Sequence, residues 1–215
     1  MSYAIHAGEF YNKRAKLYET LFNRFRYATT LKRLIRSLPI NVPIHAKILD
    51  IGCGSGLTTQ FLIERFPKAD IYGLDYSEEM LKMCSRKLPE VKLLVGDFNQ
   101  VEIFHTFPDK KRVALNDASF DCIVSAGAIS EYGDLDKALP FVYKLLKKDG
   151  FFINIGTKRN VAGIIGGKIW HFKPLGKKRF MSVCENMNFS RVHSIGIPAN
   201  LFPTSILRYV LIAQK

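Results

Sequence analysis

KILDIGCGSG, residues 47–56, is the stretch from which the rest of the chain can be interpreted. Its first five residues are mostly apolar and predict a buried strand, and the three glycines at its end predict a turn that leads into a helix from about Leu57. Glycine has no β-carbon, so the backbone of such a turn can adopt positive φ and approach a ligand closely. The first N–H groups of the following helix lack partners within it and point toward the same ligand. The stretch therefore predicts a site for a nucleotide-like molecule.

The spacing of these glycines distinguishes two kinds of nucleotide site. A dinucleotide fingerprint, G-x-G-x-x-G, would place its third glycine at position 57, where this chain has Leu57. An NAD-dependent oxidoreductase is therefore disfavoured. The tighter G-x-G-x-G spacing after an acidic residue, Asp50, is similar to the turn that binds S-adenosylmethionine (SAM) in class I methyltransferases. Taken alone, the turn also fits an ordinary strand-to-helix connection.

Acidic residues follow the next two predicted strands. The strand over 70–74 ends at Asp75, and the strand over 91–95 leads into Gly96-Asp97-Phe98. An acid at the tip of the second strand is placed to accept hydrogen bonds from both hydroxyls of a ribose. The carboxylate of Asp97 can accept from an adenine amino group beside the aromatic ring of Phe98. Three successive strand ends that carry a glycine turn, an acid and another acid favour a nucleoside site over a chance arrangement of solvated loop residues.

Strands and helices alternate over the first 155 residues, which predicts a parallel sheet covered by helices on both faces. The predicted strands are 47–51, 70–74, 91–95, 119–125 and 151–155. The predicted helices are 57–66, 78–88 with Ser77 as N-cap, and 135–147, and the polar segment 99–118 is predicted to be a long loop. Ligands of such sheets bind beyond the carboxyl ends of the strands.

The last third of the chain departs from this alternation. Its predicted elements are a loop or short helix over 156–175, a helix over 177–187, and strands over 189–197 and 207–213. Because the link between the two strands is short, we expect them to pair antiparallel.

Residues 8–38 carry apolar side chains at helical spacing with basic residues between them. They predict one or two amphipathic helices, which either pack on the edge of the sheet or act as a lid that also contacts an anionic partner. By its length of 215 residues the chain is one domain. We expect a helical lid over 1–45 and an α/β core over 46–215, with a substrate-side insertion at about 156–188.

The net charge of +13 is concentrated in the two flanks of the chain. Residues 1–47 hold nine Lys/Arg and two acidic residues, and residues 151–215 hold ten Lys/Arg and one acidic residue, whereas residues 48–150 hold 13 Lys/Arg and 16 acidic residues. This distribution favours an anionic substrate, an anionic membrane surface or RNA as a partner. The alternative is that the lysines only keep the protein soluble.

Composition limits the protein class further. No apolar run approaches the roughly 20 residues of a membrane span, and the first ten residues do not have the pattern of a signal peptide. We therefore expect a cytoplasmic protein that can be peripheral to a membrane. The four cysteines lie far apart without a C-x-x-C pair, so no metal site and no disulfide framework is expected.

Several motifs together resemble the class I SAM-dependent methyltransferases, and more narrowly the group of ubiquinone/menaquinone and phospholipid methyltransferases. They are FYNKRAKLYE (10–19), LDIGCGSG (49–56), GLDYSEEML (73–81), GD (96–97) and SFDCIVS (119–125). The resemblance implies a Rossmann-like sheet of seven strands in the order 3-2-1-4-5-7-6, with the last strand antiparallel. The loop 99–118 is longer than is usual in the family, and the region after residue 155 matches no particular subfamily.

The resemblance also implies a set of residues around SAM. In it the glycine turn lies under the methionine moiety, Asp75 accepts from the ribose, Asp97 accepts from the adenine, and Tyr18 closes over the methionine end. The complete set is Tyr18, Asp50, Gly52, Cys53, Gly54, Gly56, Asp75, Tyr76, Met80, Asp97, Phe98, Ser125 and Ala126.

Methyl transfer from SAM requires alignment, a dry site and, for an oxygen or carbon nucleophile, a proton acceptor. The candidate bases are Glu131, Tyr132 and His171, each of which could instead be an ordinary surface or packing residue. Tyr11, Phe22 and Trp170 are the aromatic residues from which we expect an apolar substrate pocket.

The leading hypothesis is a methyltransferase that converts SAM to S-adenosyl-L-homocysteine and methylates a small, partly apolar molecule or a lipid. One alternative is an RNA or protein methyltransferase that uses the basic flanks. Another is a SAM-binding regulator or subunit without catalysis, which the absence of an unambiguous base motivates.

Overall fold

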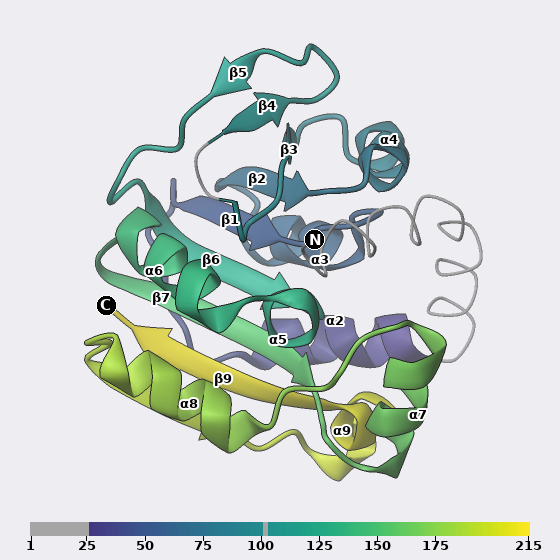
Figure 1. Cartoon of the computed structure of the whole chain (residues 1–215). Helices are drawn as coiled ribbons and strands as arrows, with labels where there is room; N and C mark the ends of the chain where they lie inside the picture. The colour runs from purple at the N-terminus through teal and green to yellow at the C-terminus, as the bar shows by residue number, and fades with distance from the viewer. Residues whose placement is uncertain (1–25, 101–102) are drawn as a thin grey trace.

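The computed structural model of the protein describes residues 26–100 and 103–215 (Figure 1). The predicted helical segment before residue 26 lies outside the described residues, and with it Tyr11, Tyr18 and Phe22.

The described residues form one sheet of nine strands in the order β5-β4-β3-β2-β1-β6-β7-β9-β8 (Figure 1). The strands are β1 (Lys47–Ile51), β2 (Asp70–Asp75), β3 (Lys92–Val95), β4 (Phe104–Thr106), β5 (Arg112–Val113), β6 (Phe120–Ala126), β7 (Leu146–Thr157), β8 (Arg191–Ile195) and β9 (Arg208–Gln214). The seven predicted strands are present in the predicted order, and β9 is antiparallel to both of its neighbours as expected.

The prediction of only seven strands was wrong, because the segment 99–118 is not entirely a loop. It contains β4 and β5, which extend the sheet antiparallel beyond β3. Phe104 fixes this extension: its side chain is 1% exposed, and its ring stacks on Phe141 with centroids 5.5 Å apart. The ring also occupies the space beside Gly96, where an added β-carbon would lie 2.3 Å from it.

The central strands are parallel, so their carboxyl ends meet at one edge of the sheet. Strand β1 pairs in parallel with β2 and β6, β2 pairs with β3, and β6 pairs with β7. This arrangement places the glycine turn after β1, Asp75 at the end of β2 and Asp97 after β3 side by side.

Helices cover both faces of the sheet (Figure 1). The helices are α2 (Tyr27–Ser37), α3 (Leu57–Arg65), α4 (Glu78–Lys87), α5 (Ile129–Tyr132), α6 (Leu135–Leu145), α7 (Val161–Ile169), α8 (Lys177–Asn186), α9 (Thr204–Leu207) and the 3₁₀ turn η1 (Ala199–Leu201). Helices α2, α3 and α4 enclose one hydrophobic core with alternate strand residues such as Ile48. Helices α5, α6 and α8 enclose the other with residues such as Leu49. Because successive side chains of β1 point to opposite faces of the sheet, the strand contributes residues to both cores.

Several local predictions are confirmed in detail. Ser77 is the N-cap of α4, and its hydroxyl accepts from the backbone N–H of Met80 at 3.2 Å. The segment 156–175 contains a short helix, α7, whereas the link before β9 is more structured than expected and holds η1 and α9.

Within residues 26–100 and 103–215, no helix combines the length and the apolar character needed to cross a membrane.

Candidate active site

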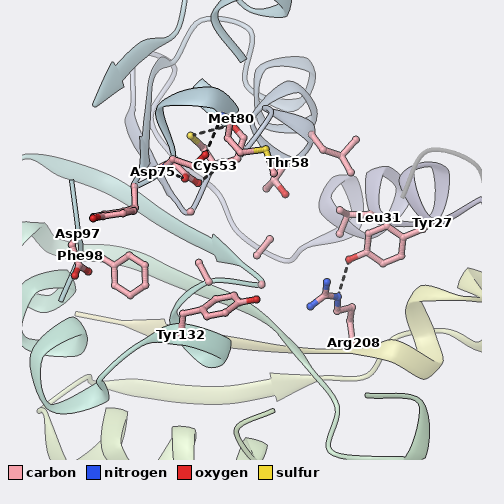
Figure 2. A pocket seen from close by; sticks show the side chains of 18 residues that line it. Tyr27, Leu31, Cys53, Thr58, Asp75, Met80, Asp97, Phe98, Tyr132 and Arg208 are labelled. Carbon is pink, nitrogen blue, oxygen red and sulfur yellow. Dashed lines mark hydrogen bonds between the residues drawn. The ribbon is translucent and has the colours of Figure 1, made fainter. Parts of the chain in front are cut away.

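A pocket opens above the carboxyl ends of β1, β2, β3 and β6 (Figure 2). One wall consists of the glycine turn, the residues that follow β2 and β3, and the segment after β6. Asp97 and Phe98 lie at one end, and Tyr27 of α2 and Arg208 of β9 lie at the other, with Tyr132 of α5 along the side (Figure 2). The pocket is therefore elongated, with carboxylates at one end and an arginine at the other.

The glycine turn presents bare backbone to this pocket. Gly52 and Gly54 have φ angles of 74° and 54°, which residues that carry a side chain rarely adopt. A β-carbon added at Gly52 would lie 2.2 Å from the β-carbon of Ala128. A β-carbon added at Gly54 would have no other atom within 4 Å. Gly56 does not line the pocket but packs against Cys84 and Leu88 of the α4 segment. Of the three glycines, Gly52 and Gly54 thus form the ligand-facing surface.

Asp75 links the turn to the second strand. One carboxylate oxygen accepts from the backbone N–H of Gly54 at 2.8 Å, and the other accepts from the backbone N–H of Ser77 at 2.8 Å. Burial raises the pKa of Asp75, and the hydrogen bonds from the backbone of Ser77, Gly54 and Tyr76 oppose this effect. Each oxygen can accept a further hydrogen bond. The carboxylate is therefore held in place at the pocket wall while it keeps acceptor capacity for a ligand.

Asp97 carries a buried carboxylate oxygen that has no hydrogen-bond partner among the described residues. Its other oxygen accepts from the backbone N–H of Asn99 at 2.8 Å, and the side chain of Asn99 in turn accepts from the backbone N–H of Asp134 at 2.8 Å. The residue lines the pocket and is 7% exposed. An unpaired buried acceptor costs about 1–3 kcal/mol, which a ligand N–H can recover. The geometry thus indicates a donor group on the ligand at this end.

Tyr76, Met80 and Phe98 provide the apolar surface between the two acids. All three line the pocket, and Tyr76 remains 41% exposed whereas Met80 is 3% exposed. Such surfaces suit the faces of a planar heterocycle, whose edge can then reach the carboxylates.

Four more of the predicted residues lie at or behind the pocket wall. Asp50 is fully buried and does not line the pocket; it accepts from the hydroxyl of Thr59 at 2.7 Å, and burial raises its pKa to about 7. The hydroxyl of Ser125 is also buried and accepts from the backbone N–H of Ile129, whereas its neighbour Ala126 lines the pocket. Cys53 lines the pocket, but a hydrogen bond with Cys84 and burial raise the pKa of its thiol, so a reactive thiolate is not expected.

The opposite end of the pocket holds a buried polar cluster that the sequence did not reveal. Arg208 donates to Glu131 at 2.5 Å and to Thr157 at 2.5 Å. It also donates to the hydroxyl of Tyr27 at 2.8 Å (Figure 2). The hydroxyl of Thr157 also donates to Glu131. The side chains of Arg208 and Glu131 are 9% and 4% exposed. The cluster ties α2, α5, β7 and β9 together at the pocket.

Of the three candidate bases, only Tyr132 lines the pocket. Its hydroxyl donates to the backbone carbonyl of Trp170 at 2.9 Å, and its ring meets Phe172 edge to face with centroids 5.7 Å apart. Glu131 is engaged with Arg208 and Thr157 in the cluster just described. His171 is exposed, and neither it nor Trp170 lines the pocket.

Comparisons with known proteins agree with this architecture. The family described as a methyltransferase domain matches residues 49–152. A malonyl-[acyl-carrier protein] O-methyltransferase of Priestia megaterium is 31% identical over 65% of this chain and 47% of its own length. A demethylmenaquinone methyltransferase of Thermotoga maritima is 25% identical over 78% of this chain and 68% of its own length. The chain thus spans less than half of the first of these relatives.

A solved structure extends the similarity in fold to the whole chain. Phosphoethanolamine N-methyltransferase 2 of Haemonchus contortus, in complex with SAM, aligns with a TM-score of 0.71 over 100% of this chain and 60% of its own. At 15% sequence identity this similarity concerns the fold.

Proposed function

Because the family described as a methyltransferase domain matches residues 49–152, we propose that the chain is a class I SAM-dependent methyltransferase, which transfers the methyl group of SAM to a small molecule and releases S-adenosyl-L-homocysteine. SAM supplies a methyl group that its sulfonium already activates, so the protein has to bind, align and exclude water. The relatives are named for acceptors as different as malonyl-[acyl-carrier protein] and demethylmenaquinone. Their names support methyl transfer in general, and the acceptor has to be inferred from this chain's own residues.

The buried, unpartnered oxygen of Asp97 is the observation that carries this proposal. An adenine amino group is a donor of the right kind for it. Asp75, fixed by Gly54 and Ser77, is placed on the neighbouring strand to accept from ribose hydroxyls. Gly54, with open space where a β-carbon would be, leaves room for the methionine moiety to lie against the backbone. The residues present therefore fit SAM.

The acceptor then occupies the end of the pocket lined by Tyr27, Tyr132 and Arg208. Helix α2 closes this end with Tyr27 and Leu31, which supports a lid role for the N-terminal segment, residues 1–45. The insertion 156–188 reaches the same end, because the hydroxyl of the lining residue Tyr132 donates a hydrogen bond to the carbonyl of Trp170. A pocket enclosed in this way suits a small or partly apolar acceptor better than a base within a folded RNA.

A labelling experiment tests the activity. Purified protein, methyl-labelled SAM and an extract of cells that express the protein are incubated, and the products are separated into organic, aqueous small-molecule, nuclease-sensitive and protein fractions. Label in either small-molecule fraction is expected. Label that nuclease releases would make the protein an RNA methyltransferase, and label in protein would make it a protein methyltransferase. No label despite tight binding of S-adenosylhomocysteine would indicate a SAM-binding regulator or subunit.

We expect Tyr132→Phe to lower the rate of methyl transfer by less than about tenfold. The tyrosine hydroxyl donates to the Trp170 carbonyl, so its loss weakens the attachment of the insertion without removing a base. Loss of a general base would instead cost about 10²–10⁴-fold. The measurement is kcat with the acceptor found by labelling, and Tyr143→Phe, on α6 beside Phe189, is the matched control. A hundredfold fall in kcat for Tyr132→Phe alone would assign Tyr132 as the base.

A further inference from the structure

Helix α7 differs from a typical surface helix in which of its faces is buried. Gly163 and Gly167, four residues apart, form its buried face, whereas its branched aliphatic side chains point outward. An added β-carbon would lie 1.8 Å from the carbonyl oxygen of Lys158 at Gly163, and 2.6 Å from that of Phe172 at Gly167. The glycines therefore allow the helix backbone to lie directly on the protein. Val161, Ile165 and Ile169 recur every four residues on the outer side, which gives an exposed apolar stripe.

Further exposed apolar side chains lie on the segment that packs beside α7. Helices α7 and α9 lie together beyond the carboxyl ends of β6 and β7 (Figure 1), and the Asn160 side chain donates to the carbonyl of Ile206 at 2.9 Å. Six of the nine large hydrophobic residues that are exposed in the described part of the chain belong to α7 or to the segment 202–206, which runs into α9. We call them the apolar face: Val161 (75% exposed), Ile164 (43%), Ile165 (53%), Ile169 (60%), Phe202 (58%) and Ile206 (47%).

Basic residues accompany the apolar face, and acidic residues are nearly absent from this part of the sequence. Arg159 and Lys168 are exposed at the two ends of α7. Residues 151–215 contain Glu185 as their only acidic residue, and it lies on α8. Branched apolar side chains on one side of a helix, together with Lys and Arg, are the features of a segment that lies in the interface of an anionic bilayer.

From this combination we infer that α7 and α9 dock the protein onto an anionic phospholipid membrane. Aliphatic side chains would enter the boundary between head groups and acyl chains, while Arg159 and Lys168 contact the phosphates. A second copy of the chain fits the face less well, because a two-fold interface brings the same positive charges together. RNA also fits less well, because nucleic-acid surfaces use aromatic stacking, which isoleucine and valine cannot provide.

The docked face lies next to the proposed acceptor end of the pocket. Tyr132 lines the pocket and holds the carbonyl of Trp170, the residue that directly follows α7. Docking would therefore bring that end of the pocket close to the bilayer. The inference concerns where the protein binds and does not depend on which molecule is methylated.

Trp170 directly follows α7 and is the only tryptophan in the sequence, so its fluorescence reports on the surroundings of the apolar face. The full-length protein is mixed with phosphatidylcholine vesicles that contain about a third phosphatidylglycerol, and with vesicles of phosphatidylcholine only. We expect co-sedimentation with the anionic vesicles, a blue shift of the Trp170 emission, and quenching by brominated acyl chains. Binding to the neutral vesicles should be much weaker.

Ile165→Ser removes an apolar side chain without changing the charge and should weaken partitioning into anionic vesicles about fivefold or more. Ile44→Ser is the matched control, because Ile44 is 68% exposed but lies before β1, outside the apolar face. Thermal unfolding of both variants should match the parent protein, since both side chains are exposed. Equal partitioning of the two variants, or unquenched Trp170 in the bound protein, would overturn the inference. A dimer in solution that Ile165→Ser dissociates would overturn it in favour of a self-association surface.

Discussion

Arg208→Met is expected to lower the free energy of unfolding at neutral pH by about 3–5 kcal/mol, because it leaves the Glu131 carboxylate buried without its cation. The ion pair measures 2.5 Å, and the two side chains are 9% and 4% exposed, so water cannot readily replace the guanidinium. Methionine has a similar length but no hydrogen-bond donor, and Tyr27 and Thr157 lose a partner as well. For a chain of this length the loss corresponds to a fall in Tm of about 6–20 °C.

Thermal unfolding followed by circular dichroism measures this effect, and two further variants identify its cause. Arg191→Met removes an exposed arginine from the neighbouring strand β8 and should change the Tm by little. Glu131→Gln added to Arg208→Met should recover most of the lost stability, because the cluster then holds no unpaired buried charge. If the double variant is as unstable as Arg208→Met alone, the arginine acts through packing and the buried ion pair is not the cause.

The Arg208 cluster also illustrates what the sequence could not predict. Glu131 and Arg208 are 77 residues apart, and Tyr27 and Arg208 are 181 residues apart. No local sequence pattern indicates that these residues meet. Tyr27 continues a helical pattern, and Arg208 is one basic residue at the start of an apolar strand. Only the order of the strands brings them together. A basic residue at the edge of a buried strand is the one feature that could have suggested a buried partner.

The carboxylate end of the pocket, in contrast, could be predicted because its features are local. A glycine turn directly after a buried strand, and acids directly after the next two strands, follow from the alternation of strands and helices. Parallel pairing then places them together. The β4–β5 extension was missed because the segment 99–118 is largely polar and only one of its described apolar residues, Phe104, is fully buried. A single buried aromatic residue in a polar stretch does not produce a periodic pattern.

Asp75→Ala is expected to weaken the binding of S-adenosylhomocysteine about ten- to 150-fold, which corresponds to about 1.5–3 kcal/mol for hydrogen bonds to a charged group. The carboxylate lies in the pocket wall and is held by two backbone N–H groups at 2.8 Å, so it is preorganised to accept from ribose hydroxyls. Titration calorimetry of the purified protein gives the dissociation constants. Asp70→Asn, at the other end of β2 and paired with Lys92 at the surface, is the matched control and should bind as the parent protein does.

Because Asp75 also accepts from Gly54, its removal could weaken binding by disturbing the glycine turn. A second ligand separates the two effects: the analogue of S-adenosylhomocysteine that lacks both ribose hydroxyls. If Asp75 binds the ribose, Asp75→Ala should cost little affinity for this analogue, and the two changes should not add. An equal loss with both ligands would mean that Asp75 supports the turn and that the ribose lies elsewhere. Non-additive losses would fix the orientation of the cofactor, with the adenosine toward Asp75 and Asp97 and the methyl group toward Tyr132.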